Sequence, residues 1–584
     1  MNENVIEFKN FGFQYNAQAS PTLYNIDLNI KKGEKVLIAG PSGCGKSTLV
    51  HCMNGLIPFS YKGVSTGSLT LKGKETKDMS LFEISRSVGT VLQDSDAQFV
   101  GLTVAEDIAF SLENNCVTEP DLHKRVMQAA LLVGIENHLK SSPREISGGQ
   151  KQRVSVAGVI VGDVDVLIFD EPLANLDPAT GKQAIELIDQ VAKDTGAAVI
   201  IIEHRLEDVL HRYVDRVVLM HAGRIIADMS SDDLLSSNLL EENGIREPLY
   251  ITALKYAGVD ITPDKHPSNI NDIVIDETDA QKVREWFTNT PQGAKSDKSE
   301  EILKINDLKF SYEGKDRLIL KGITTSISAG EMTAIVGTNG AGKSTFAKVI
   351  CGLEDAKSDE IFFEGSDFSL LSIKERAERI GYVMQNPNQM ISKIMIYDEV
   401  AFGLRNRNVP EEEIEKKVEK ALKICGLWKF RKWPISALSF GQKKRVTIAS
   451  ILTLDPKMLI LDEPTAGQDY AHYTEIMDFL LELNRQGITV LMITHDMHLM
   501  LEYARRALVF SDGKIIRDDT CANVLTDKDI VEKASLKETS LYELAIKCGI
   551  TDGTAFVQRF IDFERDVVRK ESGSRIEDGG QING

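Results

Sequence analysis

The sequence predicts an α/β fold that is built twice in tandem, and two observations predict it. A glycine-rich stretch between a strand-like apolar run and a helix-like run occurs as "GPSGCGKST" from Gly40 and as "GTNGAGKST" from Gly337. Apolar runs that end in paired carboxylates, "VDVLIFDEP" and "KMLILDEP", follow each stretch. Buried strands that alternate with helices are typical of parallel α/β sheets.

Matched positions give the length of the repeat and the place of an insertion. Lys46 and Lys343 differ by 297 positions, whereas Asp170 and Asp462 differ by 292. The first copy therefore contains an insertion between these points, which we place in "IPFSYKGVST". The helix-like segments "LYITALK" and "LYELAIK" also lie 292 positions apart, so we expect each half to end in a small helical appendage.

Four segments follow from this repeat. We expect a first domain over residues 1–235 and a helical appendage with a linker over 236–300, where "TNTPQGAKSDKSE" is polar and rich in turn residues. A second domain is expected over residues 301–530. The last segment, 531–584, is expected to hold a second helical appendage and a disordered tail, "ESGSRIEDGGQING".

Composition narrows the possible partners. The 584 residues carry a net charge of −19, which argues against nucleic acid and against adhesion to an anionic lipid surface. The N-terminal stretch does not resemble a signal peptide, and no apolar run is long enough to span a bilayer, so we expect no lipid insertion. The seven cysteines form no CxxC pair and are expected to be reduced cytosolic thiols.

Each glycine-rich stretch has the spacing of a P-loop, in which backbone N–H groups and a helix N-terminus hold phosphates. Lys46 and Lys343 are expected to reach the β- and γ-phosphates of ATP, and Ser47 and Ser344 to ligate Mg²⁺. The expected nucleotide-binding residues of the two loops are Gly40, Pro41, Ser42, Gly43, Cys44, Gly45, Lys46, Ser47, Thr48, Gly337, Thr338, Asn339, Gly340, Ala341, Gly342, Lys343, Ser344 and Thr345. Cys44 is expected to serve as a small residue.

The paired carboxylates lie where hydrolysis needs them. Asp170 and Asp462 are candidates to hold Mg²⁺ through water. Glu171 and Glu463 are candidates to polarise the attacking water. Such residues at strand ends are common, and their spacing from a P-loop makes the assignment specific.

Two further pairs complete the chemistry. The apolar strands "AAVIIIEHR" and "ITVLMITHD" deliver His204 and His495 close to where a γ-phosphate would lie. Tyr15 and Tyr312 precede the P-loops and could stack on adenine, or they could be ordinary core aromatic residues.

The ordered set resembles the ATP-binding-cassette ATPases, and it occurs twice. Its remaining members are the signature stretches "ISGGQKQR" and "SFGQKKR", and the D-loops with Asp177 and Asp469. The resemblance implies catalytic and metal-binding roles for Gln93 and Gln385. It also implies that ATP contacts Ser147, Gly148, Gly149, Gln150, Ser439, Gly441 and Gln442.

Cassettes of this family work as head-to-tail dimers, so the resemblance implies nucleotide sites formed between the two halves. The first site would join Lys46, Glu171 and His204 to the signature at Ser439. The second site would join Lys343, Glu463 and His495 to the signature at Ser147.

Among twin-cassette proteins, the chain looks like the energising ATPase of energy-coupling-factor importers of vitamins and metals. Gln98 follows Gln93 by five residues, as in that family, although Gln389 follows Gln385 by only four. The segment "GIREPLYITALKYAG" looks like the insert of its fused members, some of which are associated with thiamin or its pyrimidine precursor.

The resemblance implies a peripheral ATPase at the cytoplasmic face of the cell membrane. Its partners would be a transmembrane coupling subunit and a small membrane subunit that binds the substrate. The alternative is a soluble twin-cassette ATPase that acts on the ribosome or in regulation.

Phe440 departs from the family pattern, which has glycine at this point of the signature. Ser439, Gly441 and Gln442 remain, so we expect the ring to pack outside the phosphate pocket and both sites to hydrolyse ATP. The alternative is that the first site holds ATP and turns it over slowly.

Overall fold

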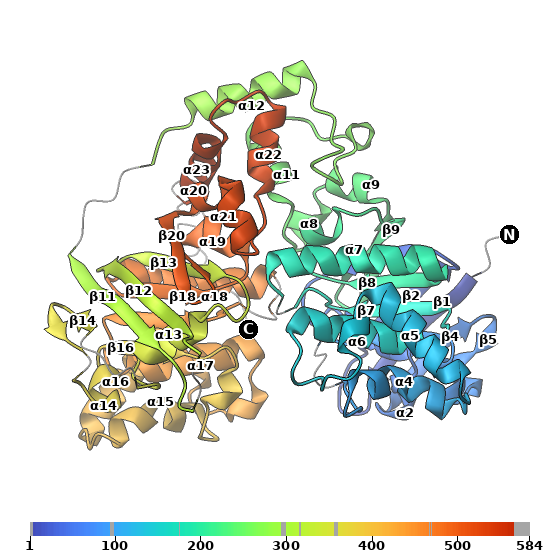
Figure 1. The fold of residues 1–584 in the computed structure, drawn as a ribbon, viewed down its shortest axis with the longest axis horizontal. Coiled ribbons are helices and arrows are strands. Elements are labelled where there is room, and N and C mark those ends of the chain that lie inside the picture. Colours follow the sequence, from blue (N-terminus) through green and yellow to red (C-terminus); the bar gives the residue numbers. More distant parts are fainter. Residues whose placement is uncertain are drawn as a thin grey trace. The chain divides into compact units, whose positions relative to one another are not determined.

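The computed structural model describes residues 4–93, 98–174, 176–293, 300–314, 317–355, 360–368, 370–465, 468 and 470–565. The chain forms two compact units, Met1–Asp279 and Ala280–Gly584, which we describe separately. Each unit combines a mainly parallel sheet, an antiparallel sheet and helices (Figure 1), so the predicted tandem α/β fold is confirmed.

The first unit is built on two sheets. Their strands are β1 (Asn4–Tyr15), β2 (Leu23–Lys31), β3 (Lys35–Ala39), β4 (Gly63–Leu71), β5 (Lys74–Glu75), β6 (Val88–Val91), β7 (Val166–Asp170), β8 (Ala198–Ile202), β9 (Arg216–His221) and β10 (Arg224–Met229). The larger sheet has the order β10-β9-β3-β8-β7-β6, in which β10 pairs antiparallel and the other neighbours pair in parallel. The smaller sheet, β2-β1-β4-β5, is antiparallel.

Helices alternate with the strands of the first unit, and α1 begins directly after β3 and its glycine-rich turn. They are α1 (Lys46–Met53), α2 (Leu56–Phe59), α3 (Leu81–Ser85), α4 (Val104–Asn114), α5 (Asp121–Val133), α6 (Gly148–Ile160), α7 (Pro178–Thr195), α8 (Leu206–Val209), α9 (Ser231–Leu235), α10 (Leu239–Glu242) and α11 (Leu249–Tyr256). Helices α4, α5 and α6 pack on one another and form the helical subdomain that carries the first signature.

The second unit repeats both sheets. Its strands are β11 (Glu301–Phe310), β12 (Leu320–Ser328), β13 (Met332–Gly337), β14 (Ile361–Phe363), β15 (Ser366–Asp367), β16 (Ile380–Val383), β17 (Met458–Asp462), β18 (Thr489–Ile493), β19 (Arg506–Ser511) and β20 (Lys514–Thr520). The orders are β16-β17-β18-β13-β19-β20 and β12-β11-β14-β15. The first unit differs in its longer β4, which pairs with β1 as far as Tyr15 and Gly63 and holds the end of the inserted segment.

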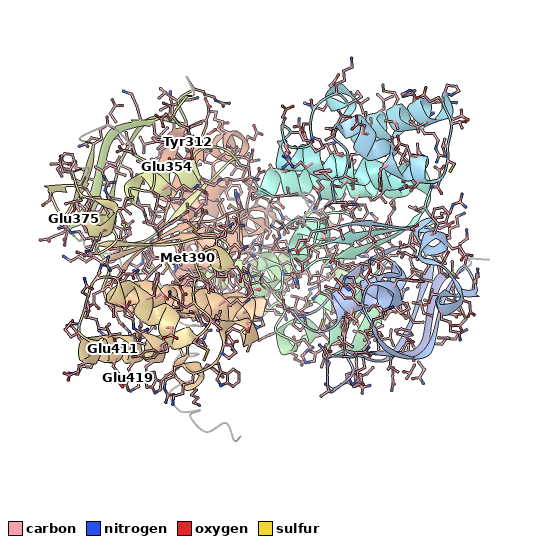
Figure 2. All side chains as sticks on the ribbon, turned by 90° about the horizontal axis from the view of Figure 1, so that it is seen from below. Tyr312, Glu354, Glu375, Met390, Glu411 and Glu419 are labelled. Atoms are coloured by element: carbon pink, nitrogen blue, oxygen red, sulfur yellow. The ribbon has the colours of Figure 1, made fainter. Side chains whose placement is uncertain are left out.

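The helices of the second unit begin with α12 (Glu277–Asn289), which contains the boundary between the units. The others are α13 (Lys343–Ile350), α14 (Ile373–Arg376), α15 (Ile396–Arg405), α16 (Glu411–Ile424), α17 (Phe440–Leu452), α18 (Tyr470–Arg485), α19 (Met497–Tyr503), α20 (Cys521–Thr526), α21 (Lys528–Lys533), α22 (Ser540–Lys547) and α23 (Gly553–Phe563). In α16 the buried residues Ile414, Val418 and Leu422 recur every four positions. Glu411 and Glu419 of the same helix lie on the outside of the second unit (Figure 2).

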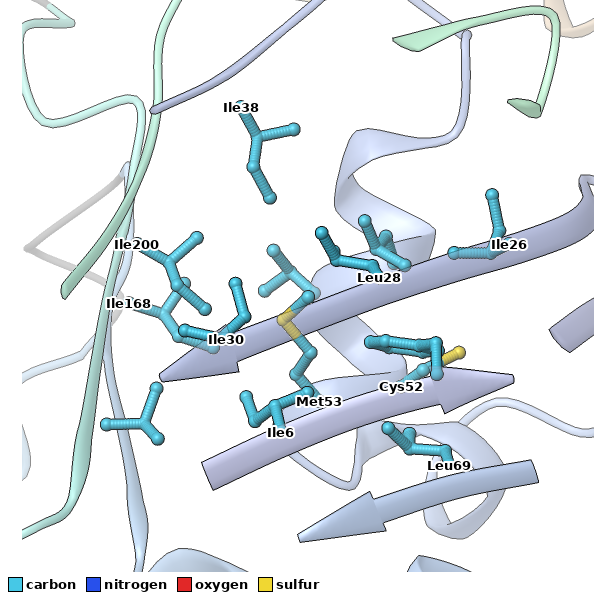
Figure 3. Packing of buried hydrophobic residues seen from close by; sticks show 14 of the residues in the cluster. Ile6, Ile26, Leu28, Ile30, Ile38, Cys52, Met53, Leu69, Ile168 and Ile200 are labelled. Atoms are coloured by element: carbon cyan, nitrogen blue, oxygen red, sulfur yellow. The ribbon is translucent and has the colours of Figure 1, made fainter. Parts of the chain in front are cut away.

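The core of the first unit lies where its two sheets meet around α1. Ile6 and Ile30 of the antiparallel sheet, Met53 of α1, and Ile168 and Ile200 of the parallel sheet form one buried cluster (Figure 3). The central parallel strands are buried on both faces, which explains their continuous apolar sequences. The site described below begins where these strands end.

The segment expected to form the first appendage divides between the units, because α11 lies in the first unit and most of α12 lies in the second. Tyr250 of α11 is 1% exposed, and its hydroxyl donates to the carbonyl oxygen of Pro267 at 2.6 Å. In the second unit, Trp286 of α12 contacts Phe556 and Phe563 edge to face, with ring centroids 5.8 and 5.6 Å apart. Across the described ranges, no helix combines the length and the apolar character needed to cross a membrane.

Candidate active site

The first P-loop connects the end of β3 to the start of α1. Gly43 and Gly45 have φ of 74° and 106°, a left-handed backbone that side chains resist. Lys46 is 5% exposed, and its Nζ donates to the carbonyl oxygens of Gly40 at 2.7 Å and Pro41 at 3.0 Å. The ammonium is therefore held inside the loop beside a helix N-terminus, where a phosphate is stabilised.

The second P-loop has matching geometry. Gly340 and Gly342 have φ of 77° and 100°. Lys343 Nζ donates to Gly337 O at 2.8 Å and to Thr338 O at 2.9 Å. Two independent copies of one sequence motif thus reach the same local structure.

Cys44 and Ala341 occupy equivalent places in the two loops, and both side chains are 3% exposed. Each belongs to the hydrophobic core of its unit. Burial raises the pKa of the Cys44 thiol. Cys44 therefore packs as a small core residue, and only its backbone is available to a nucleotide.

The carboxylates of the first site follow β7. Glu171 accepts hydrogen bonds from Gln93 Nε2 at 2.7 Å and pairs with His204 Nε2 at 3.0 Å. Burial favours a higher pKa for Glu171, but the hydrogen bond and charge of His204 outweigh it and lower the pKa. Burial and the charge of Glu171 raise the pKa of Asp170 to about 6. The structure thus brings Gln93 and His204 to the predicted carboxylate pair.

The second site is arranged differently around the equivalent residues. His495 Nε2 lies 3.4 Å from Glu463 Oε1, and within the described ranges no hydrogen bond reaches that oxygen. Burial and the charge of Asp462 raise the pKa of Glu463. Tyr382 donates its hydroxyl hydrogen to Asp462 Oδ2 at 3.1 Å. The Glu463 carboxylate is consequently less well stabilised by hydrogen bonds than that of Glu171.

Both glutamates share an uncommon backbone. Glu171 and Glu463 have φ of 48° and 47°, in the left-handed region that a residue with a side chain enters at some cost. Their N–H groups donate to Ile202 O at 2.9 Å and Ile493 O at 3.0 Å. Each glutamate is thus still held by the neighbouring strand of the sheet just as its own strand turns away.

The residues present suit Mg²⁺. Ser47 and Ser344 supply hydroxyl oxygens directly after the P-loop lysines, and Asp170 and Asp462 supply carboxylates, which are the hard oxygen ligands that Mg²⁺ prefers. Burial and the charge of Glu171 raise the pKa of Asp170, and a bound cation would favour its ionised form. Among the described residues, three or more His, Cys, Asp or Glu side chains nowhere cluster as a metal site.

The signature serines cap the helices that follow them. Ser147 Oγ accepts from the N–H of Gln150 at the start of α6, and Ser439 Oγ accepts from the N–H of Gln442 at the start of α17. Both serines are exposed. Phe440 is the first residue of α17, has no positive φ and is 38% exposed. The ring therefore lies at the surface on an unstrained helical backbone.

The two glycines of the first signature differ in the room that a Cβ atom would have. A Cβ atom on Gly148 would meet nothing within 4 Å, whereas one on Gly149 would lie 2.8 Å from Thr180 Cγ2. In the second signature, a Cβ on Gly441 would lie 3.3 Å from Gln468 Oε1. A side chain is accommodated at the position of Gly148 and Phe440, whereas at the following position a Cβ atom would come close to a neighbouring side chain.

The predicted adenine-stacking residues also match each other. The hydroxyl groups of Tyr15 and Tyr312 lie 3.1 Å from Thr48 Oγ1 and Thr345 Oγ1, respectively. In the first unit Tyr61, from the inserted segment, lies edge to face with Tyr15 at 6.3 Å between centroids.

The second glutamines hold their loops in different ways. Gln98 Oε1 accepts from the N–H of Leu92 at 3.2 Å, and its Nε2 donates to Thr90 O at 3.1 Å. Gln389 ends a short 3₁₀ helix, Pro387–Gln389. Of the two D-loop residues, Asp177 caps α7 through the N–H of Thr180, and Asp469 lies outside the described residues.

Sequence reasoning missed two residues at these sites. Glu203 is 3% exposed and accepts from the backbone N–H of Leu173 at 3.3 Å. Lys444 is 0% exposed, and burial lowers its pKa to about 8. The sequence did carry a signal for Lys444, because this position of the repeat holds Gln152 in the first half and a basic residue in the second.

The fold and both sites define a twin P-loop nucleotide hydrolase. A family model described as "ABC transporter" matches residues 23–174 and 320–466, and one described as "ATP-binding cassette cobalt transporter" matches residues 237–310. The chain belongs to the ABC transporter family, as one of its ATP-binding ATPases, with two cassettes fused in one polypeptide.

Full-length relatives share this organisation. Proteins named "Putative ABC transporter ATP-binding protein" are 57% identical in Clostridium perfringens, 54% in Enterococcus faecalis and 52% in Staphylococcus aureus. The alignments cover 96%, 97% and 98% of this chain and 98%, 100% and 100% of those proteins. A solved structure described as CbiO1 of Clostridium perfringens, part of the ABC transporter complex cbiONQ, is 39% identical with a TM-score of 0.37, over 40% of this chain and 94% of that one.

Proposed function

We propose that the chain is the energy-coupling ATPase of a membrane importer for a vitamin, a vitamin precursor or a metal ion. The match of residues 237–310 to the family model described as an ATP-binding cassette cobalt transporter carries this proposal. The chain would act at the cytoplasmic face of the cell membrane as a peripheral subunit.

Its partners would be a transmembrane coupling subunit and a small membrane subunit that binds the substrate. Two exposed apolar side chains at equivalent positions of the repeat support such docking. Leu102 and Ile394 are 82% and 78% exposed, and each follows the glutamine segment of its unit. Exposed apolar side chains of this size are candidates for burial against a partner.

In this proposal each nucleotide site is completed by the signature of the other half. The exposure of Ser147 and Ser439 supports this, because both hydroxyls are open to a partner surface. Mg²⁺ would be held by Ser47 with Asp170, and by Ser344 with Asp462, near Gln93 and Gln385. Bound there, it would neutralise phosphate charge during hydrolysis.

Glu171 and Glu463 would each orient and polarise a water molecule, with His204 and His495 holding the carboxylate on its other side. Cycles of nucleotide binding and hydrolysis would shift the two halves between conformations that the membrane partners distinguish.

Co-purification with the membrane proteins encoded beside the chain tests the proposal, with mass spectrometry of the small molecule that they retain. Leu102→Asp together with Ile394→Asp is expected to abolish co-purification, because a carboxylate disfavours burial at an apolar contact. Tyr213→Asp, at a side chain that is 74% exposed, is the matched control and is expected to retain the partners. Normal co-purification of the double variant would contradict the docking surface.

A further inference from the structure

A buried lysine joins three segments of the second site. Lys444 lies on α17, five residues after Ser439, and is 0% exposed. Its Nζ donates to the backbone carbonyl oxygens of Glu463 at 2.7 Å and Gln385 at 3.2 Å. One ammonium group therefore connects the signature helix, the glutamine that follows β16 and the glutamate that follows β17.

In the first unit an uncharged residue stands at the position that is equivalent to Lys444. Gln152 occupies the equivalent position of α6, and its Nε2 donates to Pro172 O at 2.7 Å. Gln93 there bonds the Glu171 carboxylate directly at 2.7 Å. The connection between the glutamine segment and the catalytic carboxylate is thus made by a side chain in the first unit and by Lys444 through two backbone carbonyls in the second.

General fold stability is a weak reason for such a lysine. Burying a cation is costly, and neutral carbonyl oxygens compensate it less than a carboxylate would. In the first unit the equivalent position is filled by an uncharged glutamine that has one carbonyl partner, Pro172. Lys444 instead bonds two carbonyls from two segments, and the nearby carboxylates of Glu463 and Asp462 oppose the lowering of its pKa by burial.

We propose that Lys444 is a positioning residue of the second nucleotide site. By fixing the backbones of Glu463 and Gln385 to α17, it sets where the Glu463 carboxylate stands when water attacks. Hydrolysis at this site then depends on the placement of the helix that begins at Ser439. The proposal rests on the assignment of Glu463 as the residue that polarises water.

The test uses the full chain with the first site silenced by Glu171→Gln. In this background Lys444→Gln, which copies Gln152, is expected to lower kcat by about tenfold or more. The KM for ATP and the affinity for a fluorescent ATP analogue are expected to stay within about twofold, because Lys444 contacts no P-loop residue among its hydrogen-bond partners. Lys444→Met, which keeps the volume and removes the charge, is expected to behave alike and serves if the glutamine variant does not fold.

The matched control is Gln152→Leu in a Glu463→Gln background, in which the first site reports alone. A change of no more than about twofold in kcat is expected there. The Lys444 proposal is overturned if both Lys444 variants keep kcat within about twofold, or if kcat, nucleotide affinity and Tm fall together. Activity that persists in the Glu171→Gln, Glu463→Gln double variant would overturn it together with the assignment of Glu463, whereas an inactive double variant beside normal Lys444 variants would overturn the Lys444 proposal alone.

Discussion

The hydroxyl oxygen of Ser439 and the backbone N–H of Gln442 form a 3.3 Å hydrogen bond that starts α17, and Gln442 Oε1 accepts from the N–H of Ser439 at 3.1 Å in return. This reciprocal capping fixes the loop by its first and fourth residues. The residue between them that departs from glycine, Phe440, takes no part in it. Its ring is exposed, and the equivalent Gly148 has open space at its Cβ position.

Phe440→Gly is therefore expected to change the ATPase rate by less than about threefold, which is under about 0.7 kcal/mol of barrier. The rate is measured on the chain assembled with the membrane partners proposed above. A rise of tenfold or more would show that the phenylalanine restrains the first site, as the slow-site alternative requires.

The two signature glycines give a matched pair of variants. Gly149→Ala is expected to destabilise the chain by about 1–3 kcal/mol, because its Cβ would lie 2.8 Å from Thr180 Cγ2. Gly148→Ala is expected to be neutral or slightly stabilising, since alanine favours a helix and the space is open. Thermal unfolding compares them, and equal Tm values for the two variants would refute the steric explanation.

Removal of both carboxylates is expected to separate binding from hydrolysis. In the Glu171→Gln, Glu463→Gln chain, ATP affinity should stay within about threefold while kcat falls by at least about a hundredfold, the range of a lost general base. Equilibrium binding and phosphate release measure the two quantities. Hydrolysis at the wild-type rate would show that neither glutamate acts on the attacking water.

The cysteines are expected to differ in reactivity with a maleimide. Among the seven, Cys116 is exposed and the others are buried. Burial raises the pKa of Cys44, so its thiolate is scarce near neutral pH and its reaction should be slow. Cys116→Ser is expected to remove the fast phase of labelling, whereas Cys44→Ala should leave it unchanged. A fast phase that survives Cys116→Ser and is lost in Cys44→Ala would contradict the buried position of the P-loop thiol.

A charge pair beneath the first P-loop makes stability depend on pH. Lys35 of β3 is 9% exposed and pairs with Asp189 of α7, which also pairs with Lys193 at 2.8 Å. Burial favours a higher pKa for Asp189, but the hydrogen bonds from Lys193 and Lys35 outweigh it and lower the pKa. The contribution of this aspartate is therefore present above its unfolded-state pKa and is lost as pH falls through the lower folded-state value.

Asp189→Asn is expected to destabilise the first unit by about 1–3 kcal/mol at pH 7, because it leaves Lys35 buried without its anion. The difference from wild type should shrink as the solution becomes acidic. Urea unfolding followed at several pH values measures this trend. A deficit that is independent of pH would mean that the pair contributes by packing alone.

The sequence predicted the tandem fold because its strongest signals are local. Glycines with positive φ, an apolar strand and a lysine at fixed spacing determine a P-loop within a short segment, as Gly45 and Lys46 illustrate. Helical appendages at equivalent places were likewise predicted from the spacing of apolar residues. The family resemblance predicted a role for Gln93. Its Nε2 lies 2.7 Å from Glu171 Oε2, and the two residues follow the neighbouring strands β6 and β7.

Contacts between distant segments could not be predicted in this way. The carbonyl partners of Lys444 lie 59 and 19 positions away, and charge alone marks a lysine as a surface residue. The contact of Tyr61 with Tyr15 depends on how the inserted segment extends β4, which a count of inserted residues does not reveal. For Phe440 the sequence left open the backbone φ, which the structure shows is not positive at this residue.

The left-handed backbone at Glu171 and Glu463 has a consequence for how these sites tolerate change. Each residue stores about 1–3 kcal/mol of conformational strain, and the surrounding sheet holds it through one N–H bond to the adjacent strand. The backbone conformation of the glutamate thus sets the direction in which its carboxylate points. Glycine at either position would relieve the backbone strain and raise the stability of the fold, but it would remove the carboxylate and abolish hydrolysis. Selection for stability and selection for turnover therefore act in opposite directions at these two positions.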